Sequence, residues 1–246
     1  MTLILALPTE QGIVLASDTQ YTSGEVRSSG PKLYALSPQA AWAGAGEVAL
    51  IQRVQEAIAD LPAGHDLPQL RDTLARIVKQ SVQSLLELDV LTDYLQGDPG
   101  LLLGLHPGDF IFAEYNNAQP LMLHVAANGT PEWFNSFFAS GNGANFAYAL
   151  LQKYQNIELT LDQAVLLAYR VIDETIQVGA YGLDYPIDIW LIDQQSLHQL
   201  DANDFETLAK ASDVLRLKEI ELLQSQKLHF KVAKPAHKVK HKKPKK

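Results

Sequence analysis

Thr2 has the features of a catalytic nucleophile, because it follows Met1 directly and would open the chain once Met1 is removed. Its hydroxyl and its free α-amine would then belong to one residue, so that a nucleophile and a base stand side by side. A free α-amine has a pKa of about 7.7 to 8.0, so a useful fraction is neutral at pH 7. That neutral amine could take the hydroxyl proton, directly or through a water, while the threonine oxygen attacks a peptide carbonyl.

Three further residues have the types that such a reaction needs: Asp18, Lys32 and Gly44. A Lys32 ammonium near the α-amine would lower the pKa of that amine, and Asp18 would hold the lysine in place and keep its charge. The backbone N–H of Gly44 could stabilise the oxyanion, a contribution of roughly 2.7 to 4 kcal/mol per donor in known enzymes. Taken alone, each also has an ordinary explanation: a turn residue, a charge at a strand edge and a turn glycine.

Hydrophobic patterns predict the elements that must position these residues. Continuous apolar runs indicate strands covered on both faces, and stripes at helical spacing indicate amphipathic helices. The predicted strands are residues 3–7, 12–17, 32–36, 40–44, 101–105, 109–115, 120–126, 134–139 and 187–192. The predicted helices are residues 48–61, 144–154, 161–178 and 204–226, with one more after Asp66 whose apolar stripe runs from Leu70 to Leu86. Residues 23–30 are polar and are predicted to form a loop.

The order of these elements decides between fold classes. Strands come in groups, each followed by two helices, whereas a doubly wound parallel sheet alternates strand and helix. The sequence therefore predicts an α+β fold, a four-layer αββα sandwich with two antiparallel β-sheets between two helix layers.

Composition excludes several classes of protein. The 246 residues contain no Cys, so thiol nucleophiles, thiolate metal sites and disulfides are absent. The scattered histidines lack the spacing of metal ligands, and we expect no metal and no cofactor. No apolar stretch approaches the roughly 20 residues of a spanning helix, and the first residues do not resemble a secretory signal. We therefore expect a cytoplasmic protein with no membrane partner.

Charge divides the chain into two parts. Residues 227–246 hold nine Lys, three His and no acidic residue, which leaves a net charge of −17 on residues 1–226. We predict one domain over 1–226 and a basic, Lys/His-rich disordered tail over 227–246. An acidic domain is a poor nucleic-acid ligand, so only the tail offers contacts for nucleic acid, an acidic partner or neighbouring subunits.

The motifs together resemble the proteasome β-type family of N-terminal nucleophile hydrolases, in its divergent bacterial, proteasome-like branch. The resemblance runs from Thr2 to about Ile192. The matching features are Asp18 sixteen residues after Thr2, Thr22 four residues later in SDTQYT, Lys32 in PKLYAL, Gly44 in WAGAG, and the sequence Gly141-Asn142-Gly143 where the family has Gly-Ser-Gly.

The resemblance implies a threonine-type endopeptidase, with Thr2, Asp18, Lys32, Gly44 and Asn142 as catalytic residues and Thr22 as a substrate contact. It also implies a peptide or unfolded protein as substrate, a homo-oligomer built as a ring or a helical stack, and an ATPase unfoldase as partner. The helical stripes within 48–88 are expected to leave apolar surface for that assembly.

Two other functions remain open at this point. The family carries an Asp-x-x-Ser that supports the nucleophile, and no such motif occurs here, although Asp184 is near its place. An inactive assembly or scaffold subunit with the same fold is therefore the alternative, and a small-amide hydrolase of the same superfamily ranks below it. Asn142 is equally well explained as the cap of the helix that follows, and Thr22 as an ordinary strand residue.

Overall fold

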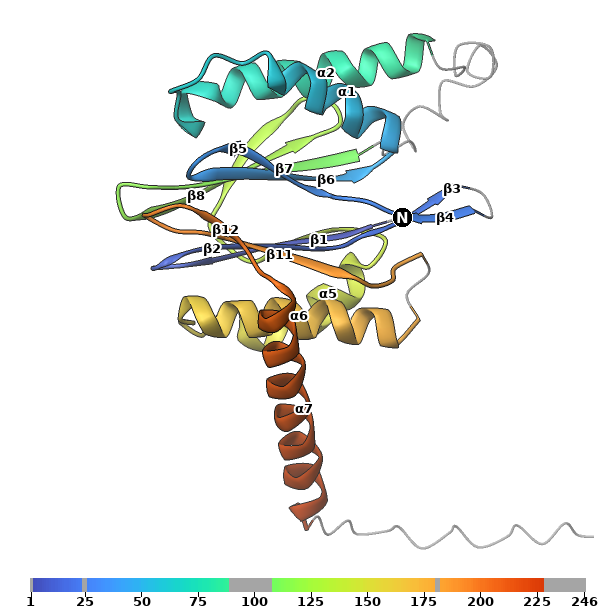
Figure 1. Ribbon diagram of the computed structural model, residues 1–246, viewed down its shortest axis with the longest axis vertical. Coiled ribbons are helices and arrows are strands. Elements are labelled where there is room, and N and C mark those ends of the chain that lie inside the picture. The colour runs from blue at the N-terminus through green and yellow to red at the C-terminus, as the bar shows by residue number, and fades with distance from the viewer. Residues whose placement is uncertain (1, 24–25, 89–107, 180–181, 228–246) are drawn as a thin grey trace, which may run out of the picture.

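Two antiparallel β-sheets lie face to face between two pairs of helices (Figure 1). This computed structural model describes residues 2–23, 26–88, 108–179 and 182–227. The predicted α+β class and the αββα sandwich are confirmed. The predicted strand at 101–105 and the basic tail from residue 228 onward lie outside the described residues.

The first sheet has the strand order β10-β1-β2-β11-β12. Its strands are β1 Leu3–Thr9, β2 Gly12–Asp18, β10 Phe138–Gly141, β11 Ile187–Ile192 and β12 Leu197–Gln199. β1 and β2 form a hairpin, in which Ile4 pairs with Ser17 and Thr9 with Gly12. Because every residue of β2 is buried, the strand is covered on both faces, as its apolar sequence predicts.

The second sheet has the strand order β5-β6-β7-β8-β9. Its strands are β5 Leu33–Ser37, β6 Ala40–Gly46, β7 Gly108–Asn116, β8 Gln119–Ala126 and β9 Pro131–Phe134. The central pairing is between β6 and β7, where Gly44 lies opposite Phe110 and Gly46 opposite Gly108.

Helices cover the outer face of each sheet (Figure 1). On the second sheet lie α1 Val48–Ala59 and α2 Leu67–Leu88. On the first lie α5 Ala144–Leu151, the short 3₁₀ helix Gln152–Tyr154 and α6 Leu161–Gln177. Thr160 caps α6 with the predicted capping box. The last helix, α7 Ala202–Ser225, projects away from the sandwich. None of the described helices is long and apolar enough to cross a membrane.

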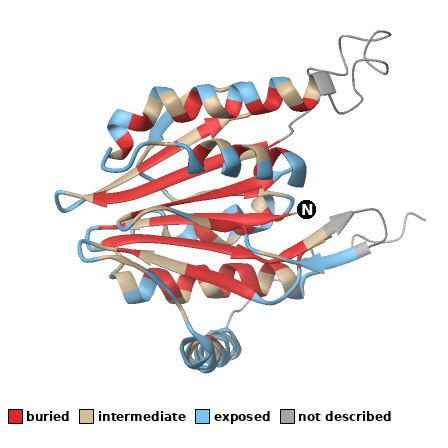
Figure 2. Cartoon of the chain, turned by 45° about the horizontal axis from the view of Figure 1, so that its top comes forward, coloured by how far each residue is buried: buried red, intermediate tan, exposed pale blue. Residues whose placement is uncertain are grey.

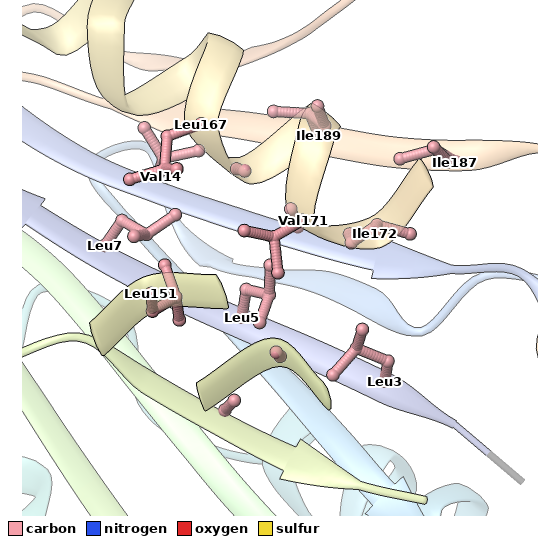
Figure 3. Packing of buried hydrophobic residues seen from close by; sticks show 14 of the residues in the cluster. Leu3, Leu5, Leu7, Val14, Leu151, Leu167, Val171, Ile172, Ile187 and Ile189 are labelled. Carbon is pink, nitrogen blue, oxygen red and sulfur yellow. The ribbon is translucent and has the colours of Figure 1, made fainter. Parts of the chain in front are cut away.

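Three apolar clusters hold the layers together, and the buried positions follow the strands and the inner helix faces (Figure 2). In the cluster between α6 and the first sheet, Leu3 and Leu5 of β1 pack near Val171 of α6 (Figure 3). Ile4 and Ala6, with the opposite side-chain direction, belong to the cluster between the two sheets. This alternation means that Thr2, two residues before Ile4, faces the space between the sheets.

Several predicted elements need correction. The segment predicted as a loop, residues 23–30, contains the strand β4 Val26–Ser29, which forms a separate antiparallel pair with β3 Gln20–Ser23, a strand that was not predicted. The single strand predicted at 134–139 is two strands, β9 and β10, which belong to different sheets. A polar hairpin lacks the apolar alternation that marks a half-buried strand, and a break between two neighbouring apolar segments leaves little trace in the hydrophobic pattern.

Candidate functional site

Thr2 lies at the beginning of β1, at the end of the sandwich beside β3 and β4 (Figure 1). It is 3% exposed. Leu3, the next residue, donates its backbone N–H to Oδ1 of Asp18 at 2.8 Å. The β1–β2 hairpin brings the two together because it pairs the start of one strand with the end of the other.

Asp18 and Lys32 form a buried ion pair. Nζ of Lys32 lies 2.8 Å from Oδ1 of Asp18, and both side chains are 0% exposed. Oδ2 of Asp18 accepts the backbone N–H of Gln20 at 3.1 Å. The ammonium also lies 5.3 Å from the centre of the Tyr21 ring, a cation–π contact. The same carboxylate oxygen therefore holds the lysine and the backbone next to Thr2.

Burial perturbs both members of this pair. Desolvation lowers the pKa of Lys32, while the charge of Asp18 and its hydrogen bond act in the opposite direction. Desolvation likewise raises the pKa of Asp18, against the opposing effects of Lys32 and of the Leu3 and Gln20 N–H groups. The two pKa values move towards each other, which suits a pair that acts on the protonation of a neighbouring group.

An open pocket of about 440 Å³ contains Thr2. Its lining comes from β6, β7, β10 and the start of β1, so both sheets contribute. The residues that line it are Thr2, Ala45, Gly46, Glu47, Gly108, Asp109, Gly141 and Asn142. A larger pocket of about 760 Å³ lies at the opposite end of β1, around Thr9 and Glu10, and contains none of the predicted site residues.

Gly141 fixes the backbone of Thr2. It pairs with Leu3 across β1 and β10 and has a φ of +98°, a conformation that favours glycine. A Cβ at this position would lie 2.0 Å from the carbonyl oxygen of Thr2, far inside van der Waals contact. The first glycine of Gly141-Asn142-Gly143 is therefore required by the close approach of the two chains.

Asn142 lines the Thr2 pocket and is exposed. It does not cap the helix that follows, because the N-cap of α5 is Gly143 and no side chain bonds there. The explanation of Asn142 as a helix cap is therefore wrong. Instead, Asn142 lies in the lining of the pocket that contains Thr2.

Gly44 and Gly46 occupy different places on β6. Gly44 lies within the strand, where a Cβ would meet Ile51 and Phe110 on the helix side of the sheet. Gly46 lines the pocket with Ala45, whereas Gly44 does not belong to the described lining. The alternation of β6 could have indicated the place of Gly44, because Ala43 and Ala45 face the space between the sheets and Gly44 between them does not.

Thr22 and Asp184 are the two remaining residues that the sequence singles out. Thr22 belongs to β3 and pairs with Arg27, and its side chain lies outside the described residues. Asp184 is exposed, and its carboxylate accepts the backbone N–H of Tyr185 at 2.9 Å. It does not belong to the described lining of the Thr2 pocket.

The pocket also contains Asp109, a residue that was not singled out from the sequence. Oδ2 of Asp109 accepts the Ser140 hydroxyl at 2.7 Å, and its Oδ1 lies 3.0 Å from Nε2 of His124. These residues come from β7, β10 and β8, so the contact with Ser140 joins the two sheets beside Thr2. The signal available was an aspartate just before the apolar run at the start of β7. Within the described residues, no group of three His, Cys, Asp or Glu could hold a metal ion.

Both the sequence and the structure are similar to known proteins. The family described as Proteasome subunit matches residues 108–185. The structure is similar to Anbu from Hyphomicrobium sp. strain MC1, as a Gly-1 mutant, with a TM-score of 0.71 at 16% identity over 94% of this chain and 100% of that one. It is equally similar to Anbu, the ancestral beta-subunit, from Yersinia bercovieri, with a TM-score of 0.71, 13% identity and the same coverage. No curated protein matches the sequence.

The chain therefore has the fold of a proteasome subunit. The resemblance to a divergent bacterial proteasome-like branch is confirmed by the family match and by both structural relatives. Within this proteasome fold, Thr2 and Asn142 share one pocket, while Asp18 and Lys32 form the buried pair behind the first residues of β1.

Proposed function

We propose that the protein is a threonine-type endopeptidase that uses the Thr2 hydroxyl as nucleophile after removal of Met1. The observation that carries this proposal is the bond from Leu3 N–H to the Asp18 oxygen that also holds Lys32, beside a pocket that contains Thr2. A buried ion pair is costly, since it loses hydration that a surface pair keeps. Its hydrogen bond to the residue that follows Thr2, whose side chain lines an open pocket, supports a chemical role.

The proposed reaction has two steps. In the first, Oγ of Thr2 attacks the peptide carbonyl carbon, and the neutral α-amine of Thr2 accepts the hydroxyl proton. The tetrahedral intermediate then expels the leaving amine, which takes that proton, and an ester on Thr2 remains. In the second, a water gives one proton to the α-amine and attacks the ester carbonyl carbon. The tetrahedral intermediate then expels the Thr2 oxygen, which takes that proton back from the amine, so that the carboxylic acid leaves and the hydroxyl and the neutral amine are restored.

The surrounding residues have distinct roles in this proposal. Lys32 keeps the α-amine neutral at lower pH by like-charge repulsion, and Asp18 positions Lys32. The sequence favours Gly44 as the oxyanion donor, but Gly46 lines the pocket, so we assign the backbone N–H of Gly46 to this role. Asn142, also in the lining, is a further donor for the substrate or the oxyanion. Thr22 stays a predicted substrate contact.

The test compares three proteins with a set of unfolded protein and peptide substrates. The natural chain is expected to lack Met1 by intact mass and to hydrolyse peptides. Thr2→Ala should lose at least about a thousandfold in kcat/KM, while Thr2→Ser, which keeps a hydroxyl, should retain measurable turnover. Peptide hydrolysis by a preparation that retains Met1, or by Thr2→Ala at the natural rate, would contradict the proposal.

A scaffold subunit without catalysis is the second candidate. One observation in its favour is Asn142, which occupies the position where the family has Ser. Another is Asp184, whose carboxylate accepts the backbone N–H of Tyr185 and does not belong to the described lining of the Thr2 pocket. A chain that loses Met1 and assembles, but leaves every substrate intact, would establish this alternative.

The same proposal includes partners. A peptide or unfolded protein is the substrate. Subunits of this fold generally form oligomeric assemblies, and copies of this chain are proposed to assemble into a ring or a helical stack. An ATPase unfoldase and a cytoplasmic setting complete the proposal.

A further inference from the structure

We infer that the hydrogen bond from Ser140 to Asp109 positions Thr2 relative to Gly46, by holding the two sheets at a fixed separation beside the pocket. The inference rests on the proposed function, because it concerns the geometry of that reaction. Ser140 acts here as a positioning residue, and it does not belong to the described lining of the pocket.

The proposed nucleophile and the proposed oxyanion donor lie on different sheets (Figure 1). Thr2 directly precedes β1 of the first sheet, and Gly46 ends β6 of the second. Strand pairing fixes neighbours within one sheet, whereas side chains between the inner faces set the separation of two packed sheets. An oxyanion donor acts only at about 2.7 to 3.1 Å from the developing charge. The geometry of the reaction therefore depends on contacts that cross between the sheets.

Ser140 makes such a contact and lies next to the residue that fixes Thr2. It stands opposite Ile4, so the two side chains share a face of the sheet, and Ile4 belongs to the cluster between the sheets. The Ser140 hydroxyl, on a residue that is 6% exposed, donates to Oδ2 of Asp109 at 2.7 Å. Gly141, the next residue, closely approaches the carbonyl oxygen of Thr2. A shift of Ser140 is therefore transmitted to Thr2.

The other end of this hydrogen bond is connected to Gly46. Asp109 of β7 pairs with Ala45 of β6, and Gly46 pairs with Gly108. The two strands lie close together here, because a Cβ on Gly108 would be 2.9 Å from the carbonyl oxygen of Ala45. The bond from Ser140 therefore joins the strand pair that carries Gly46 to the strand beside Thr2.

A ring contact runs beside the hydrogen bond and keeps the two sheets packed without it. Nε2 of His124 on β8 lies 3.0 Å from Oδ1 of Asp109. The His124 ring also packs against Phe138 of β10, with centroids 5.0 Å apart. Loss of the Ser140 hydroxyl leaves this ring contact in place. The substitution is therefore expected to change the spacing at the pocket while the sandwich stays folded.

Tyr115 provides a matched control at the far end of the sandwich. Its hydroxyl, on a residue of β7 that is 4% exposed, donates to the carbonyl oxygen of Glu10 at 2.6 Å. Glu10 lies in the turn between β1 and β2, so this hydrogen bond also joins the two sheets. Ser140→Ala and Tyr115→Phe each remove one buried hydroxyl between the sheets, but only the first lies beside Thr2.

The first measurement is the hydrolysis of fluorescein-labelled casein, an unfolded protein, by chains without Met1. Ser140→Ala should lower kcat at least about tenfold with KM within about twofold, since a misplacement of about 1 Å costs up to about a hundredfold. Ser140→Thr, which keeps a hydroxyl, should recover most of kcat, and Tyr115→Phe should keep the natural value. A natural kcat in Ser140→Ala, an equal loss in Tyr115→Phe, or no recovery in Ser140→Thr would overturn the inference.

The second measurement does not depend on turnover. The Leu3 N–H is bound to Asp18, and its hydrogen exchange reports how firmly the backbone beside Thr2 is held. Exchange at Leu3 should be at least about tenfold faster in Ser140→Ala and unchanged in Tyr115→Phe. If the natural chain leaves casein intact, the kinetic result counts against the peptidase proposal, and the exchange decides the inference. An unchanged exchange rate at Leu3 in Ser140→Ala would then overturn it.

Discussion

The backbone around Thr2 is held as tightly as the side chains of the site. The carbonyl oxygen of Thr2 faces Gly141, and the following N–H is bound to Asp18. A nucleophile must be held within a fraction of an ångström of its reactive position, and these two contacts set that position from opposite sides.

Gly141→Ala should therefore reduce activity. The added methyl would lie 2.0 Å from the Thr2 oxygen and would force the first residues of β1 to move. We expect kcat/KM for peptides to fall at least about a hundredfold, since a shift of about 1 Å costs this much in other enzymes. Gly64→Ala is the control for an alanine at positive φ, because that glycine has open space around it. Equal activity of the two variants would contradict the account.

Asp18→Asn should destabilise the fold as well as the site. The substitution leaves a buried lysine without its partner, which typically costs about 3 to 5 kcal/mol. Urea unfolding measures this loss. The control is Asp72→Asn, whose aspartate is 81% exposed beside Arg71 and should change stability by less than about 1 kcal/mol. Similar unfolding free energies for the two variants would show that the buried pair is not a strong constraint.

Individual elements are held by polar contacts that the hydrophobic pattern does not reveal. Glu114 of β7 is 6% exposed, and its carboxylate accepts the backbone N–H of Leu67, the first residue of α2, at 2.7 Å. Burial raises the pKa of Glu114, an effect that the Leu67 N–H opposes and Asp66 reinforces. The helix is therefore fixed to the sheet by a carboxyl group whose charged form is unfavourable.

The pH dependence follows from the sign of that shift. A carboxyl group with a raised pKa gives its full stabilisation below its unfolded value of about 4.5, and this contribution is lost as the pH rises through the folded value. Glu114→Gln keeps an acceptor for Leu67 and has no charge. It should raise the melting temperature by a few degrees at pH 7 and leave it unchanged at pH 4. A lower melting temperature at pH 7 would mean that the charge itself stabilises α2.

Elements with regular apolar patterns could be predicted from the sequence, and so could the part of the site that they carry. The strands that begin at residues 3 and 12 form a hairpin. Because the hairpin pairs the start of β1 with the end of β2, the spacing between Thr2 and Asp18 in the sequence already predicts that they lie close together. Asp109, His124 and Ser140 lie on strands from both sheets, and no local interval indicates that they meet. The hairpin of β3 and β4 was not predicted, because its polar residues do not alternate with apolar ones.

At the scale of the whole molecule, the exposed apolar surface is not where the sequence suggested. The stripes of α1 and α2 pack on the second sheet, and among their described residues only Val48 is an exposed large apolar side chain. Five such side chains lie instead on the projecting α7, namely Val214, Leu217, Ile220, Leu222 and Leu223. Exposed large apolar side chains favour contact with another protein, and α7, which carries five of them, is the first helix to test for assembly.

Assembly and catalysis should respond to different substitutions. Leu217→Asp changes a side chain that is 60% exposed on α7 and should lower the sedimentation coefficient of the assembled protein. Thr2→Ala removes one hydroxyl inside the pocket and should sediment like the natural chain while losing peptide turnover. Dissociation of the Thr2→Ala protein, or unaltered sedimentation of Leu217→Asp, would contradict this separation.

The central claim is that Thr2 is a nucleophile, and covalent labelling tests it most directly. The natural chain would be incubated with a peptide electrophile and its intact mass measured, followed by mapping of the modified residue. The account predicts loss of Met1 and one adduct per chain on Thr2, which is absent in Thr2→Ala. An adduct elsewhere, or an unmodified Thr2 in a chain that has lost Met1, would contradict it.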